Sequence, residues 1–491
     1  DPKDMITGFE FPQVRKTSSF VFWNRTRIYV MVLTLICLTF MQMNTLTLNF
    51  TVICMDDIVE DFHMFHNSTE THWFERSTEK SLLFSGVAIG GLIGLVPSVP
   101  QISSIGLRNT QTISGFISGL GSFLFPLAVS VGFYTSFLCR VLQGIGAAVL
   151  FTAVGVVPGV WAPKSEANTF MSILACAFQL SNVICMPVSG LLCESAVGWR
   201  SIYYISGAIT FVLYTVFWFT YTDDPKLHRN VSQKELRKIS TGKVEKIKEP
   251  VPYFAVSTDP TVIISWISLF GGNMGFYVLC IYGPTYLREV LKFDVKETGF
   301  LTALPFILSA IAKFSAGRIS DKLTGLSERA RFVFFASIFQ IGLVAGLVVM
   351  AFTTNRVIAQ IAFNFAIVSS GLNIMGVVKF ADLPKNLIFV NLPICQFAGS
   401  FREILYKIET LKVRCLQHVH YTLTVMSFTA YASQFLSPTL VSIICPNYTN
   451  EQWKTFFLVI SGLIVACNAG FPFLARSDAA GYTKKQEPTV K

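Results

Sequence analysis

Twelve long stretches of this chain contain no Asp, Glu, Lys or Arg, and they limit its fold more than any other feature. Most are long enough to cross about 30 Å of hydrocarbon as a helix that rises about 1.5 Å per residue. They are continuously apolar, and lipid forces a backbone to satisfy its hydrogen bonds within a helix. We therefore predict an all-α membrane protein with twelve transmembrane helices. The stretches are residues 28–55, 81–107, 110–139, 141–163, 167–193, 201–222, 261–287, 298–312, 332–355, 357–378, 416–450 and 455–475.

The charged residues lie mainly in the intervening loops, and their signs predict an orientation. Of the 491 residues, 52% are apolar and only 14% are charged. Basic residues precede the first stretch and outnumber acidic ones in residues 223–259. In residues 56–80 most of the charged residues are acidic. By the positive-inside rule, both termini and the long basic loop are cytoplasmic. The formal charge of +10 is therefore attributed to cytoplasmic loops, and no nucleic-acid partner is expected.

The basic loop divides the stretches into two groups of six, which is typical of transporters built from two parallel repeats. Residues 380–414 break the pattern between the tenth and eleventh stretches. Their uncharged part is 16 residues long and contains Pro393, so we predict a cytoplasmic insertion and not a thirteenth span. The expected organisation is a cytoplasmic tail at 1–27, a six-helix half at 28–222, a cytoplasmic linker at 223–260, a second six-helix half at 261–475 and a cytoplasmic tail at 476–491.

The predicted outer loops contain two acceptors for N-glycosylation, Asn67 in "NST" and Asn447 in "NYT". Glycosylation at these positions suits a membrane of the secretory pathway. We expect an integral protein of the plasma membrane or of a lysosomal or vesicular membrane.

Cysteines and histidines in the predicted outer regions have two interpretations each. Cys193 and Cys445 lie near outer ends of spans and could form a disulfide.

His63, His66 and His72 lie in the acidic loop, but their spacing matches no standard metal-ligand pattern. We favour a solvated loop over a pH sensor or a metal centre, and we expect no metal site.

Two loops at corresponding places in the halves carry charges that the spans lack. "FSAGRISDKLTG" follows the second span of the second half, and "SSIGLRNT" follows the second span of the first half. Glycine permits close helix approach, and an aspartate at the membrane edge can pair with arginine or accept hydrogen bonds from a helix start. Such a loop can hold the cytoplasmic side shut; alternatively, it only anchors two helices. The expected gate residues are Arg108, Gly317, Arg318, Asp321 and Lys322.

The second-half loop resembles the G-x-x-x-D-[RK] loop of the major facilitator superfamily. "RVLQGIGAAV", "VVPGVWAPKSEANTFMSI", "GWRSIYYISG" and "NFTVICM" resemble its anion:cation symporter branch, which includes sialin, vesicular glutamate transporters and type I phosphate transporters. The resemblance implies two pseudo-symmetric six-helix halves that transport a small anion by alternating access. It also implies a coupling ion, Na+ or H+, and no other cofactor.

One intramembrane arginine is the first candidate for an anion site. Arg140, Gln143, Gly144 and Ala147 share one face of a helix, and a charge inside the membrane is costly enough to suggest a function. Arg140 could pair with a substrate carboxylate or phosphate. The alternative is a side chain that snorkels outward to the membrane surface.

Three positions depart from the pattern that the resemblance implies. Proton-coupled relatives carry a glutamate where this chain has Ala147, and vesicular glutamate-type relatives carry arginines where it has Thr47 and Gly272. A carboxylate that could exchange a proton is therefore missing at the usual place. We expect neither proton coupling at this position nor glutamate transport.

Neutral polar residues complete the expected cavity, although buried amides can also serve to hold helices together. The sequence contains no H-E-x-x-H or G-x-S-x-G motif that would favour a membrane enzyme.

From the resemblance and the intramembrane arginine, we predict a monomeric carrier of a small organic anion or inorganic phosphate. The alternative is a degenerate carrier that acts as an anion channel or as a non-transporting receptor-like protein. The expected substrate-binding residues are Asn49, Arg140, Gln143, Asn182, Asn273, Tyr277 and Asn373.

Overall fold

The computed structural model describes residues 24–65, 71–163, 166–241, 258, 260–322, 328–373 and 419–474. Within these ranges every regular element is a helix, as the charge-free stretches predict. The side chains of residues 313–336 and 371–424 are outside the description. Asn67 and the expected insertion at 380–414 also lie outside the described residues.

The first six spans occupy residues 26–220 and the second six occupy residues 260–468. By length and composition, eight segments of the described chain are each sufficient to cross a membrane. The first-half spans are α1 (Thr26–Thr51), the two arms of α3 (Ser77–Val131), α4 with α5 (Phe133–Ala147 and Leu150–Trp161), α6 with α7 (Ala167–Ala175 and Ala177–Cys193) and α8 (Arg200–Thr220). The second-half spans are α11 (Pro260–Thr285), α12 (Val295–Lys322), α13 (Glu328–Phe352), α14 (Arg356–Asn373), α17 (Val419–Ile444) and α18 (Asn450–Asn468).

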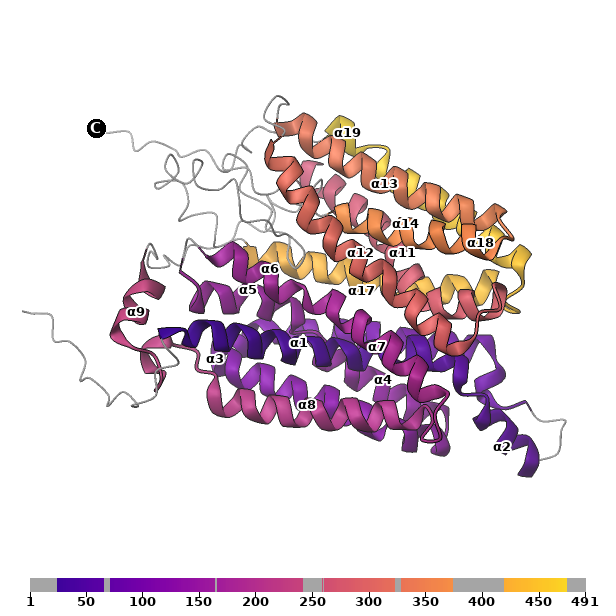
Figure 1. Ribbon diagram of the computed structural model, residues 1–491, viewed down its shortest axis with the longest axis horizontal. Coiled ribbons are helices and arrows are strands. Elements are labelled where there is room, and N and C mark those ends of the chain that lie inside the picture. The colour runs from indigo at the N-terminus through magenta and orange to yellow at the C-terminus, as the bar shows by residue number, and fades with distance from the viewer. Residues whose placement is uncertain are drawn as a thin grey trace, which may run out of the picture.

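Shorter helices lie at the ends of the spans, and two of them mark opposite ends of the bundle. Figure 1 shows α2 at one end and α9 at the other, and we call these the α2 end and the α9 end. The short elements are η2 (Val52–Cys54), α2 (Asp57–Phe65), η3 (Trp73–Glu75), η4 (Pro225–Leu227), α9 (Gln233–Ser240), the π-helical segment η5 (Tyr286–Val290) and α19 (Phe471–Leu474).

A single glycine separates the second and third spans. Helical backbone runs from Ser77 to Val131 except at Gly106, where φ is 81°. A Cβ atom at this position would overlap the carboxylate of Asp223, which follows the sixth span. Gly106 therefore combines a left-handed backbone with a close approach, and both favour glycine.

The two halves contact each other through related pairs of helices. Between the halves, α3 packs against α17 and α7 packs against α12, with a smaller contact between α1 and α11. Each main pair joins the second span of one half to the fifth span of the other. The two pairs are equivalent when the halves are interchanged, as expected of two six-helix repeats related by a pseudo-twofold axis.

Among the described side chains, a large apolar cluster packs the two halves together. The largest hydrophobic cluster contains residues from both halves, including Phe84 and Tyr282, whose ring centroids are 5.2 Å apart. A second cluster, which includes Trp161 and Tyr214, comes from the first half and the beginning of the linker. Large apolar side chains such as Leu127 and Ile341 are exposed, as expected of surfaces that face lipid.

The beginning of the expected linker packs against the first half. Glu235 of α9 is 2% exposed, and its carboxylate accepts a hydrogen bond from the Arg27 amide at 2.9 Å. Glu166 lies 3.2 Å from the Arg27 guanidinium and 2.9 Å from the Lys238 ammonium. These contacts join the start of α1, the loop before α6 and α9 at one end of the bundle.

The suggested disulfide between Cys193 and Cys445 is wrong. Cys193 instead bonds to Cys54, which lies 139 residues earlier in the sequence. Cys445 is a buried free thiol. The α1–η2 segment and α7 end beside each other, so the pairing follows from the packing of the first and fifth spans.

Candidate functional site

Arg140 of α4 is buried in the first half, and its side chain is only 1% exposed. Its Nε donates to the Leu83 carbonyl at 3.2 Å, and its Nη2 donates to the Thr45 carbonyl at 3.1 Å. Its Nη1 donates to Oε1 of Gln143 at 2.6 Å. The guanidinium thus ties α4 to α1 and α3, and it does not snorkel to the surface.

The partners of Arg140 satisfy its hydrogen bonds but not its charge. All three acceptors are neutral oxygens, and none of the ion pairs in the described part of the chain involves this guanidinium. Removing a cation from water is costly unless an anion compensates it. The site therefore combines a fixed donor fork with an uncompensated positive charge.

Gln143 was expected beside Arg140, and the structure brings the two together. The Gln143 amide nitrogen also donates to the Ser122 hydroxyl at 2.9 Å. Because the Gln143 oxygen accepts from Arg140, the amide relays the orientation of the guanidinium to the third span. Ser122 and Thr45 were not predicted, since a serine or a backbone carbonyl in an apolar span gives no distinctive sequence signal.

Among the described residues, Gln143 is the one expected binding residue that hydrogen-bonds to Arg140. Asn49 donates to the Cys280 carbonyl of the opposite half at 3.4 Å. Asn182 donates to the Phe178 carbonyl of its own helix at 2.9 Å, which leaves its buried Oδ1 without a hydrogen bond. Asn273 and Tyr277 are half-buried in α11. Asn373 ends α14, and its side chain is outside the description.

Tyr431 of α17 is a contact between the halves that the sequence did not reveal. The residue is 4% exposed, and its hydroxyl donates to the Ala147 carbonyl at 3.2 Å. A Cβ atom at Gly91 would overlap the Tyr431 ring, so glycine is what permits the ring to lie against α3. One tyrosine in an apolar stretch carries no pattern that predicts such a contact.

Arg108, an expected gate residue, makes its described contacts with the sixth span and with Asp223, which follows that span. Its Nε donates to the Trp218 carbonyl at 2.7 Å, and its amide donates to the Asp223 carboxylate at 3.0 Å. The guanidinium also lies 5.2 Å from the centroid of the Trp218 ring. Gly317, Arg318, Asp321 and Lys322 lie in the last turns of α12, and their side chains are outside the described part.

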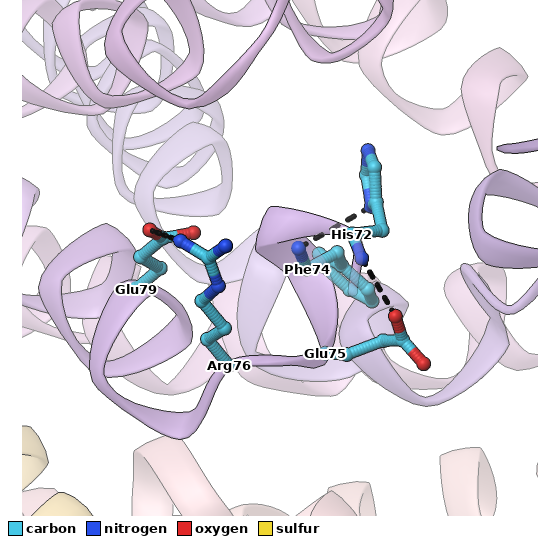
Figure 2. A network of polar contacts seen from close by, with 5 residues as sticks. All are labelled: His72, Phe74, Glu75, Arg76 and Glu79. Atoms are coloured by element: carbon cyan, nitrogen blue, oxygen red, sulfur yellow. Dashed lines mark hydrogen bonds and ion pairs between the residues drawn. The ribbon is translucent and has the colours of Figure 1, made fainter. Parts of the chain in front are cut away.

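His72 of the acidic loop belongs to a small polar network at the α2 end (Figure 2), and His66 lies outside the described residues. His72 Nδ1 accepts from the Phe74 amide at 3.3 Å, and the His72 amide donates to Glu75 at 2.7 Å. His63 Nε2 lies 3.4 Å from the same carboxylate. Burial lowers the pKa of the His72 imidazole, although the charges of Glu75 and Glu79 oppose this effect. Among the described residues, no group of three or more His, Cys, Asp or Glu side chains could hold a metal ion.

Comparisons with known proteins agree with this architecture. The family model described as the Major Facilitator Superfamily matches residues 29–385. Sodium-dependent phosphate transport protein 1 of Rattus norvegicus is 25% identical over 414 residues, which cover 84% of this chain and 83% of that protein. Sialin of Homo sapiens is 23% identical over 419 residues, which cover 85% of this chain and 79% of sialin.

Solved structures of transporters share the fold. The xylose transporter XylE from E. coli, in a partially occluded inward-open conformation, superposes with a TM-score of 0.61 at 11% identity, over 91% of this chain and 97% of that one. A bacterial homologue of the human lysosomal transporter Spinster, in an inward-facing conformation, gives a TM-score of 0.56 at 12% identity, over 91% and 96%. At these identities the likeness concerns the fold alone.

Proposed function

Because the chain belongs to the Major Facilitator Superfamily, we propose that it is a secondary transporter that carries a small organic anion or inorganic phosphate by alternating access. The α2 end would face the outside or a lumen, and the α9 end would face the cytoplasm. Two relatives, a sodium-dependent phosphate transport protein and sialin, support a transport role for this chain. The transporter would act as a monomer, and its coupling ion would be Na+ or H+.

One observation carries the choice of an anion: the buried positive charge of Arg140 has only neutral partners. Coulomb attraction is strong where water is excluded, so an entering anion would be favoured over a neutral or cationic solute. The planar fork can bind a carboxylate or a phosphate with two hydrogen bonds. Three of the five N–H groups donate to Leu83, Thr45 and Gln143, and within the described chain the other two remain for an anion.

The missing carboxylate at Ala147 bears on the coupling ion. Ala147 is buried, and its carbonyl oxygen accepts a hydrogen bond from the neutral Tyr431 hydroxyl of the other half. Neither group exchanges a proton near neutral pH. We infer that protons do not drive uptake through this position.

A ligand screen of the purified protein tests the proposal. Ligands that bind the folded protein raise its thermal unfolding temperature by mass action. Phosphate, sialic acid, nucleotides and simple carboxylates are compared with uncharged sugars of similar size. We expect at least one anion and no sugar to stabilise the protein, and uptake of that anion by reconstituted vesicles to saturate. Stabilisation by sugars alone would refute the anion assignment.

The same screen with Arg140→Lys tests the anchor. Lysine keeps the charge but lacks the fork, so the affinity for the anion should fall about tenfold or more. Arg200→Lys is the matched control, because Arg200 is exposed at the first residue of α8 and pairs with Asp57 of α2 at 2.6 Å. Equal affinities of a folded Arg140→Lys protein and of the control would exclude Arg140 from binding.

A further inference from the structure

Glu194 of the first half accepts a hydrogen bond from the start of a helix in the second half. Its Oε1 lies 2.9 Å from the backbone nitrogen of Lys296, the second residue of α12. The first amides of a helix have no acceptor within the helix, and a carboxylate there also interacts favourably with the helix dipole. Glu194 therefore caps α12 from the opposite half of the molecule.

The helices α7 and α12 also touch through two glycines, which lie about one turn from Glu194 and from Lys296 along their helices. A Cβ atom on Gly299 of α12 would lie 2.7 Å from the Met186 carbonyl of α7. A Cβ atom on Gly190 of α7 would lie 3.3 Å from the Val295 carbonyl of α12. A side chain at Gly299 would force the backbones apart, and one at Gly190 would crowd them, so the cap forms where α7 and α12 are in direct contact.

The residue before Glu194 fixes the cap to the first half. Cys193 is bonded to Cys54, at the end of the segment that continues α1. The end of α7 is thereby held to the first span and moves with it. The hydrogen bond from Lys296 to Glu194 consequently joins two bodies that separate during alternating access.

Water reaches the capped helix start, which limits the strength of the contact. A cavity of about 670 Å³ is lined there by Glu194, Asp294, Lys296 and Glu297, among others. Exposed charged contacts contribute modestly, and water can replace the acceptor when the contact opens. A contact of this kind can form and break in each transport cycle.

We propose that Glu194 is a latch that closes the α2 end of the transporter. Its carboxylate caps α12 when Gly190 and Gly299 bring the halves together, and the cap is lost when the halves part. Loss of the carboxylate shifts the population toward a state that is open at this end. The inference requires alternating access but not an anionic substrate, so its test is made without substrate.

A cysteine at position 303 reports the opening. Ala303 of α12 is 3% exposed and packs with Phe50, Ile53 and Met186 of the first half. The rate of labelling by a small water-soluble methanethiosulfonate is measured on detergent-purified Ala303→Cys protein. The parent protein with Ala303 gives the background from native cysteines.

Adding Glu194→Ala should increase the labelling rate about fivefold, which corresponds to the loss of a typical helix cap. Glu194→Gln keeps a neutral acceptor and should give a smaller increase. Glu451→Ala is the control, because Glu451 pairs with Lys454 of its own helix at 3.7 Å. Labelling of Glu194→Ala at the rate of the Glu451→Ala control would overturn the proposal.

Gly299→Ala provides a second test that leaves Glu194 intact. The added methyl group prevents the close contact and should also increase labelling of Cys at 303. Gly462→Ala is its control, because a Cβ atom there would meet no other atom within 4 Å. The latch requires both effects, so a folded Gly299→Ala protein that labels like its control also overturns it.

Discussion

The hydroxyl of Tyr431 donates a hydrogen bond to the carbonyl oxygen of Ala147, 3.2 Å away in the opposite half of the molecule. The two residues are 284 positions apart in the sequence. Gly91 makes room for the ring, and Phe151 lies edge-on to it with the centroids 6.5 Å apart. The halves therefore share a polar contact within the spans, in addition to the latch at the α2 end.

We predict that Tyr431→Phe lowers the free energy of unfolding by about 1 kcal/mol, because the ring is retained and one hydrogen bond is lost. Thermal unfolding of the purified protein measures the change. Tyr134→Phe is the control, because Tyr134 is 85% exposed and loses no buried contact. Equal unfolding temperatures for the two variants would contradict an energetic role for the Tyr431 hydroxyl.

Acidification should loosen η3, because His72 caps it in the neutral form. Nδ1 accepts a hydrogen bond from the Phe74 amide only when it carries no proton. Burial lowers the pKa of His72 in the folded protein relative to the unfolded chain. The stabilisation is therefore complete above the unfolded pKa of about 6.5, and it is lost as the pH falls from there through the folded pKa.

Hydrogen exchange of the Phe74 amide tests this pH dependence. After correction for intrinsic rates, protection should fall between pH 7.5 and 5.5 in the unmodified protein. His72→Asn should remove the dependence, because asparagine can cap a helix without titrating in this range. An unmodified protein whose protection does not change with pH would rule out the neutral cap.

The Cys54–Cys193 bond should stabilise the protein by about 2–4 kcal/mol, which is typical of a disulfide that closes a long loop. Cys54→Ala and Cys193→Ala should lower the unfolding temperature equally, and the double variant should lower it no further. Cys445→Ala serves as the control, because Cys445 is free. A peptide map under non-reducing conditions that joins Cys193 to Cys445 would refute the observed pairing.

Glycosylation should report which side of the membrane the α2 end faces. Asn447 is exposed in the loop before α18, where a glycosyltransferase could reach it. In a protein with Asn67→Gln, removal of glycans should still change the apparent mass, and adding Asn447→Gln should abolish that change. Modification of Asn67 without any modification of Asn447 would contradict the predicted topology.

Local sequence patterns were sufficient to predict the helical fold. Charge-free stretches longer than a membrane crossing have one satisfactory backbone structure in lipid, so the spans and their helical form follow directly from the sequence. The pairing of Arg140 with Gln143 was also predictable, because residues three apart share one face of a helix. The family followed from short motifs, and the match to residues 29–385 confirms it.

Contacts between distant helices were decided by the tertiary structure alone. The sequence allowed a disulfide between Cys193 and Cys445, whereas the packing of the first and fifth spans brings Cys54 to Cys193. It did not indicate that Tyr431 meets Ala147 or that Glu194 caps α12. In lipid, apolar faces of different helices are nearly equivalent, and close packing with a few hydrogen bonds selects the partners. Such selection depends on the shape of the assembled bundle, which no single stretch of sequence contains.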